Sequence, residues 1–189
     1  PEFAGEASRL NKQALLAQSL LLFVLFAFLF ALGIFIFDDF VISTLAPGFG
    51  AETVLATKGM YSVVVWIIPL TVCSGVLTAY LNAGNRFTSS SLGTFCLNLF
   101  IIAGLLMSTH SESTIAVLGG FVLLGGAARI AIQLVELSVK TPLSYLGLSM
   151  RPWLVSSEII YRYLQVAFSG SLILCFPLIF RAFATNLGE

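Results

Sequence analysis

A long uninterrupted apolar run near the start of the chain limits what it can fold into. Residues 14–37 read ALLAQSLLLFVLFAFLFALGIFIF and contain no charged side chain. A bilayer core of about 30 Å is crossed by roughly 20 helical residues, and a helix satisfies every backbone polar group internally. The run is longer than the apolar part of a signal peptide, and no small-residue cleavage site follows it. It therefore predicts a membrane-spanning helix that is retained.

Four further stretches have the same character, at about 59–82, 90–108, 115–138 and 163–181. Only 10% of the residues are charged, against roughly 25% in soluble domains. The chain is therefore predicted to be an all-α polytopic transmembrane helix bundle. Residues 1–138 are predicted to contain four spans that follow a cytoplasmic N-terminal end. Residues 139–162 are predicted to form a cytoplasmic connection, and residues 163–189 to contain the fifth span and the start of an outer loop. Without an initiator Met, we expect the chain to be part of a longer polypeptide.

The basic residues orient the bundle, because Lys and Arg are enriched on the cytoplasmic side of membrane proteins. Most of them fall on alternate connections, which the spans place on one side: Arg9, Lys12, Arg86, Lys140, Arg151 and Arg162. That side is predicted to be cytoplasmic, and 38–58 and 109–114 are predicted to be outer connections. The segment 139–162 contains Trp153 and Tyr161, and aromatic residues of this kind favour an interfacial helix with a Glu158–Arg162 pair on its exposed face.

Several functional classes are excluded. Nine basic and nine acidic residues balance, and no basic cluster is present that would bind nucleic acid. The chain has no Ser-His-Asp set, phosphate-binding loop or cluster with metal-ligand spacing, so we expect neither an enzyme nor a cofactor. The cysteines Cys73, Cys96 and Cys175 lie in apolar runs and are expected to pack there, and His110 is expected to be a solvated loop residue.

The fourth predicted span carries Arg129, Gln133 and Glu136 at a spacing that puts all three on one helix face. Arg129 lies about 16 Å along the helix from Lys140, and a charge at such depth usually faces a bundle interior or a wet cavity. These residues are therefore candidates to bind an anionic substrate. An internal Arg129–Glu136 pair, or Glu136 at the membrane interface, is an equal alternative.

Other polar and helix-breaking residues have two interpretations each. Asn98 continues a stripe from Ser90 and Thr94, and either lines a cavity or bonds to a neighbouring helix. Pro69 and Pro177 interrupt the helices of their spans. These breaks are either bends that move during transport or fixed kinks. Gly84 lies in the cytoplasmic turn Asn82–Asn85, where Gly and Asn tolerate left-handed backbone. Small residues at four-residue spacing predict close helix approach, namely Gly75 and Ala79, Ala116 and Gly120, and Ala127 and Ala131.

An ordered series of motifs runs through the chain: PEFAGE at 1–6, LAPGF at 45–49, IIPLTVCSGVLTAYLNAGNRF at 67–87, LNLFIIAG at 97–104, VLLGGAARIAIQ at 122–133 and RAFATNLGE at 181–189. In order and spacing this series resembles the MurJ/MviN family of lipid-linked oligosaccharide flippases. The resemblance implies helices three to seven of a transporter with about fourteen. The chain departs from the family pattern at Arg129, where Gln is usual, and at the additional Asn85.

The resemblance implies alternating access around a cationic cavity in the bacterial inner membrane. The implied substrate is a polyprenyl-diphosphate-linked saccharide, either lipid II or an exopolysaccharide precursor, and the implied partners are membrane lipids and the remaining helices of the polypeptide. Arginine suits this substrate because its planar fork binds phosphate oxygens in pairs. Two alternatives remain: a cation-coupled multidrug exporter, for which Glu136 is the candidate acidic site, and a membrane scaffold that does not transport.

Overall fold

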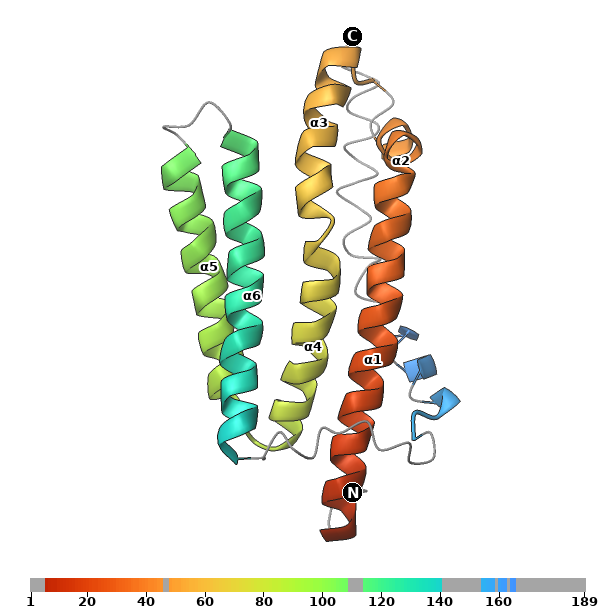
Figure 1. Cartoon of the computed structure of the whole chain (residues 1–189), viewed down its shortest axis with the longest axis vertical. Coiled ribbons are helices and arrows are strands. Elements are labelled where there is room, and N and C mark those ends of the chain that lie inside the picture. The colour runs from red at the N-terminus through yellow and green to blue at the C-terminus, as the bar shows by residue number, and fades with distance from the viewer. Residues whose placement is uncertain are drawn as a thin grey trace.

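A computed structural model describes residues 6–45, 48–108, 114–140, 154–158, 160–162 and 164–165, with the backbone alone at 6–11, 114, 115 and 140. Its main helices are α1 (Glu6–Ile36), α2 (Asp38–Leu45), α3 (Ala51–Val64), α4 (Ile67–Ala83), α5 (Thr88–Ser108) and α6 (Thr114–Lys140). No strand occurs in these residues, and the predicted all-α class is confirmed (Figure 1).

Four segments are long and apolar enough to cross a membrane: Lys12–Ile36, Ala51–Ala83, Thr88–Ser108 and Ala116–Val139. They form a row in which α6 lies between α5 and the α3–α4 pair, and α1 packs on the far side of α4 (Figure 1). The predicted fifth span, 163–181, lies almost entirely outside the described residues, as do Pro177 and His110.

The predicted outer connection 38–58 is largely helical, because it contains α2 and the first half of α3. Asp38 and Asp39 occupy the first turn of α2, where negative charge favours the helix. The Nζ of Lys58 lies 2.6 Å from Oδ1 of Asp39 and 3.7 Å from Oδ1 of Asp38. The charges that mark this segment as extramembrane therefore also tie α3 to α2.

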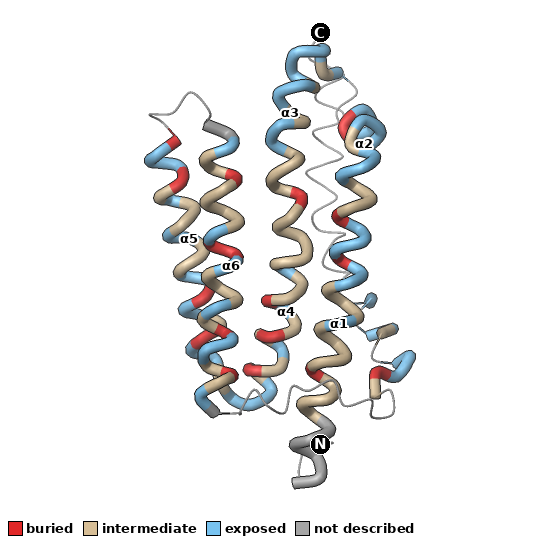
Figure 2. The backbone as a smooth tube through the Cα atoms, viewed as in Figure 1, coloured by how far each residue is buried: buried red, intermediate tan, exposed pale blue. Residues whose placement is uncertain are grey.

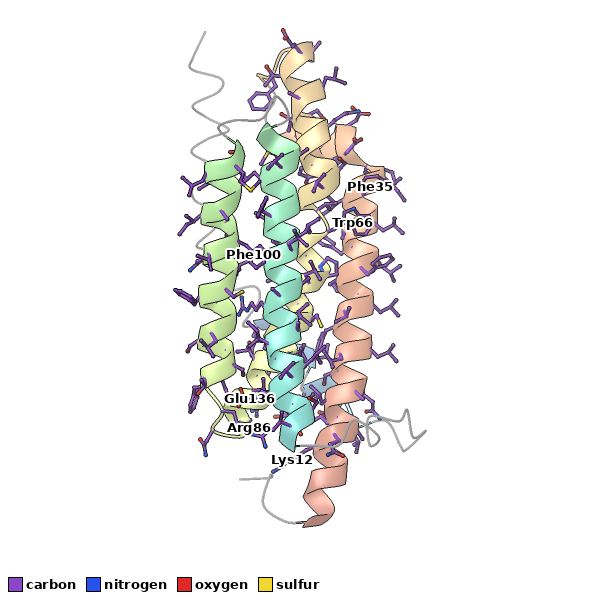
Figure 3. The ribbon with its side chains drawn as sticks, turned by 60° about the vertical axis from the view of Figure 1, so that its left-hand side comes forward. Lys12, Phe35, Trp66, Arg86, Phe100 and Glu136 are labelled. Carbon is purple, nitrogen blue, oxygen red and sulfur yellow. The ribbon has the colours of Figure 1, made fainter. Side chains whose placement is uncertain are left out.

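The second span is broken between α3 and α4 at Val65 and Trp66. Pro69 has no N–H to donate to the carbonyl oxygen of Val65, four residues earlier. That oxygen accepts instead from the N–H of Ile68, at 3.2 Å. The Trp66 ring covers the break from one side, with ring centroids 5.6 Å from Phe28 and 5.9 Å from Phe35 of α1 (Figure 3).

The turn between α4 and α5 is closed by two backbone hydrogen bonds. The N–H of Arg86 donates to Leu81 O at 2.9 Å, and that of Asn85 donates to Asn82 O at 3.0 Å. This pattern is a Schellman motif, which needs one left-handed residue. Asn85 is that residue, with a φ of 58°, whereas Gly84 has a φ of −90°. The additional asparagine, and not Gly84, thus supplies the unusual backbone conformation.

Close contact between helices depends on glycines that face a neighbour. A Cβ atom added at Gly104 of α5 would lie 2.7 Å from Phe121 Cβ, and one at Gly125 of α6 would lie 2.9 Å from Phe100 Cβ. On the other side of α6, one at Gly119 would lie 2.9 Å from Val63 Cγ1. Glycines therefore bring α6 close to both neighbours.

The small-residue pairs predicted to make these contacts are not the ones that do so. A Cβ added at Gly75 or Gly120 would meet nothing within 4 Å in the described structure, and Ala79, Ala116, Ala127 and Ala131 are exposed. That prediction is wrong for the described part of the bundle. Four-residue spacing places residues on a common face, but it does not identify the face that meets a neighbour.

Large apolar side chains cover the outer faces of the row. Phe26 and Phe30 of α1 and Phe95 and Leu106 of α5 are all exposed. Figure 2 shows that exposed positions recur along both of these helices. Such a surface is expected where hydrocarbon is the solvent. Inside the row, a small apolar cluster of Leu16, Leu77 and Leu137 joins α1, α4 and α6.

Part of the predicted interfacial segment is described and lies beside the lower part of α1 (Figure 1). The N–H of Leu154 donates to Oε1 of Gln18 at 2.7 Å, and Val155 is buried. The Glu158–Arg162 pair is present at 2.6 Å, with both side chains exposed. Leu154 thus attaches the described part of the segment to α1, and the charged pair is exposed.

We expect Gly104→Ala to lower the thermal stability of the complete protein in detergent. The new methyl group would overlap Phe121 Cβ, and overpacking of this kind costs about 1–3 kcal/mol. Gly120→Ala is the matched control, since its methyl group would meet open space. Equal melting temperatures for the two variants would contradict this account of the α5–α6 contact.

Candidate functional site

Arg129 lies on the side of α6 that packs against α5. A Cβ added at Gly93 would lie 2.8 Å from Arg129 Cγ and 3.5 Å from Arg129 O, so the arginine stem occupies the space that the glycine leaves. The side chain is half-buried. Its Nε is buried and, within the described residues, has no hydrogen-bond partner. The packing therefore fixes the stem of Arg129 without satisfying this donor.

Arg129 and Glu136 form no ion pair. In the described part of the chain, the ion pairs are those of Lys58 with Asp38 and Asp39, and of Arg162 with Glu158. Glu136 is half-buried and lies near Arg86 and Lys12 at one end of the bundle (Figure 3). The alternative of an internal Arg129–Glu136 pair is thus not seen, and the charge of Arg129 is not neutralised by its own helix.

Gln133 contacts the other neighbour of this face, α4. It is fully buried, and its Nε2 donates to Oγ1 of Thr78 at 2.7 Å. Among the described residues this is the one side-chain hydrogen bond between α4 and α6. The Oε1 of Gln133 is buried without a partner in the same residues. Gln133 therefore joins two helices, and half of its amide remains unsatisfied.

Asn98 does not lie with Arg129 and Gln133. It is exposed on α5, while Gly93 and Gly104 form the face of α5 that meets α6. Of the polar stripe that precedes it, Thr94 donates to its own helix, at the carbonyl oxygen of Ser90. The four candidate substrate-binding residues thus separate: Arg129 and Gln133 lie inside the α4–α6 part of the row, Glu136 lies towards one end, and Asn98 faces outward.

Three further residues share the unsatisfied character of Arg129 and Gln133, and the sequence analysis does not select them. Ser74, Asn82 and Ser89 each have a buried side-chain oxygen without a hydrogen-bond partner in the described structure. We call Ser74, Thr78, Asn82, Ser89, Arg129 and Gln133 the polar junction. The signal was available, because Ser74, Thr78 and Asn82 recur every four residues in an otherwise apolar span. Each unsatisfied buried group costs about 1–3 kcal/mol, so each of them needs a physical explanation.

The donor set of the polar junction does not suit a metal ion. It combines neutral oxygens with a guanidinium, which repels cations. Over the described ranges, no three His, Cys, Asp or Glu residues come together. Cys73 and Cys96 are both half-buried free thiols on different helices. The chemistry that this arrangement can offer is electrostatic and hydrogen-bonding, centred on one positive charge.

Comparison with known proteins gives the chain its family. Residues 1–175 match the family described as "Lipid II flippase MurJ". No curated protein and no solved structure matches the chain significantly. The match covers α1 to α6 and the described part of the predicted interfacial segment. With its four membrane-spanning segments in the described residues, this multi-pass membrane protein belongs to the lipid II flippase MurJ family.

Proposed function

We propose that the chain is part of a flippase that moves a polyprenyl-diphosphate-linked saccharide from the cytoplasmic to the outer leaflet by alternating access. The family match over residues 1–175 carries this proposal. The proposed process is transport and breaks no covalent bond. The membrane is proposed to be the bacterial inner membrane, where such lipids are made and used.

Arg129 supports the proposal through its charge. Two unit charges 4 Å apart interact by about 4 kcal/mol at an effective dielectric constant of 20, and by about half of that at twice the distance. A diphosphate therefore benefits from an unpaired guanidinium without touching it. Gln133 is fully buried and bonded to Thr78, so in this conformation it acts by holding α6 to α4. We assign Arg129 an electrostatic role and Gln133 a positioning role.

The diphosphate is the part of the substrate that these features favour. Nothing in the polar junction selects a particular sugar, since the junction is formed by small hydroxyl and amide groups between helices. We therefore propose the shared polyprenyl diphosphate as the recognised group, with lipid II and an exopolysaccharide precursor as its two sources. The remaining helices of the polypeptide would supply the saccharide contacts.

Alternating access requires helices that bend at defined points, and the break before Pro69 is such a point. The α3 half is tied to α2 through Lys58, while the α4 half is tied to α6 through Thr78. We propose that α3 tilts relative to α4 at Val65 and Trp66 during transport. Gly84 ends α4 next to the Schellman turn and is proposed to act only as part of that turn.

A cation-coupled drug exporter is the second candidate, and one observation favours it. Glu136 is half-buried and, in the part of the chain that the structure describes, has no ion-pair partner. Intramembrane acidic residues commonly bind or couple to cations. Glu136 lies near the basic end of the bundle (Figure 3), however, where Arg86 and Lys12 would disfavour a second cation.

Arg129→Gln is expected to slow flipping of the lipid-linked saccharide several-fold, because it removes the unpaired charge. Arg129→Lys keeps the charge and should retain most of the activity. The rate is measured with the complete protein in proteoliposomes, by the accessibility of the saccharide in the outer leaflet. Unchanged transport by the glutamine variant would eliminate the proposed role of Arg129.

Glu136→Gln separates the two candidate functions. If the protein is a flippase, this variant should leave drug susceptibility of the producing cells unaltered and should keep flipping near the wild-type rate. The measurement is a drug-susceptibility profile of a deletion strain complemented with each form. The exporter would be supported instead if the deletion strain were more drug-susceptible than the parent strain. In that case the wild-type gene, but not the Glu136→Gln form, would return susceptibility to the parental level.

A further inference from the structure

The polar junction contains buried side-chain atoms that lack a hydrogen-bond partner in the described structure. Within the described residues, the buried side-chain atoms without a hydrogen-bond partner are Ser74 Oγ, Asn82 Oδ1, Ser89 Oγ, Arg129 Nε and Gln133 Oε1. All of them belong to the junction, and they come from three different helices. Most buried polar groups in native proteins are paired with protein or with ordered water. A common cause is therefore more economical than a separate explanation for each atom.

Two contacts fix the register that brings these atoms together. Gly93 of α5 meets Arg129 of α6, and Thr78 of α4 bonds to Gln133 one turn further along α6. Ser74 precedes Thr78 by one turn on the same face of α4, so it lies level with Arg129. Ser89 precedes Gly93 by one turn on α5. Because α5 runs in the direction opposite to α6, Ser89 lies level with Gln133. The unsatisfied atoms thus occupy two adjacent levels, with Asn82 one turn beyond.

The chemistry of these atoms selects the ligand. Arg129 Nε–H can only donate, the oxygens of Gln133 and Asn82 can only accept, and the hydroxyls of Ser74 and Ser89 can do either. An anion would satisfy the arginine but would be repelled by the two amide oxygens. A metal cation would suit the oxygens but would be repelled by the guanidinium. Water donates and accepts at once, and buried waters typically make about three hydrogen bonds to such groups.

We propose that the polar junction is an internal water site, in which ordered water molecules link Arg129 to Ser74, Ser89 and the Oε1 of Gln133. Water reaches it from the end of the bundle where Arg86 and Glu136 lie (Figure 3), past Asn82 at the end of α4. The charged arginine is thereby solvated inside a helix bundle in hydrocarbon. This inference does not depend on which substrate the protein carries.

The test is water-edited solid-state NMR on the complete, isotope-labelled protein in lipid bilayers. This experiment measures how fast magnetisation passes from water protons to each side chain. Ser74 and Leu77 form a matched pair within the wild-type protein, because both are buried on α4 less than one turn apart. We expect transfer to Ser74, Ser89 and Arg129 Nε to be several-fold faster than transfer to Leu77, which lies in the apolar cluster. The Arg129 signal is identified by its loss in Arg129→Gln.

Two results would overturn the proposal. Transfer to Ser74, Ser89 and Arg129 as slow as that to Leu77 would show that the junction is dry and that its groups bond directly to one another or to the backbone. A shift of the Arg129 Nε signal when chloride is exchanged for bromide, without fast water transfer, would show that an anion occupies the junction. As a second measurement, the Ser74→Ala, Ser89→Ala double variant should reduce water transfer to Arg129 and leave that to Arg86 unchanged.

Discussion

Close contact along α6 is the constraint on which the described structure depends. Helices in a membrane gain little from burying apolar surface, because lipid is as apolar as the side chains, and their association relies on packing and interhelical hydrogen bonds. Gly93, Gly104 and Gly125 remove the side chains that would separate α5 from α6, and Gly119 does the same towards α3. The central position of α6 in the row follows from having such glycines towards both neighbours.

The same contact explains how Arg129 is accommodated. A charged residue at depth in a membrane costs roughly 2.5–3.5 kcal/mol on insertion scales, and no carboxylate in the described structure pairs with it. Gly93 gives its stem a place beside α5, and we propose that water bound by the hydroxyl and amide groups of the polar junction solvates its charge. Packing and the proposed function thus meet at one residue, because the charge that we propose favours a diphosphate is also the one whose stem packs against Gly93.

In the bent second span, local chemistry determines where the helix breaks, and tertiary contacts stabilise the break. Pro69 removes one hydrogen bond and thereby fixes where the helix breaks, since only the carbonyl of Val65 loses its donor. What stabilises the break is Trp66 between Phe28 and Phe35 of α1. Both halves pack against α6, but their polar ties differ: Lys58 with Asp39 joins α3 to α2, and Thr78 with Gln133 joins α4 to α6. A hinge is therefore a reasonable proposal at this point.

The sequence by itself determined the all-α class, the apolar segments, and the family, because hydrocarbon imposes length and composition on any spanning helix and because the motifs keep their order. It also identified Arg129 as a candidate, because a charged side chain within an apolar span is unusual whichever way it faces. Only the tertiary structure decided which faces meet: glycines outside the predicted pairs make the contacts, Asn98 is exposed, and Ser74 and Ser89 are buried. Helical periodicity places residues on a common face, but the identity of the neighbour across that face depends on contacts between segments far apart in the chain.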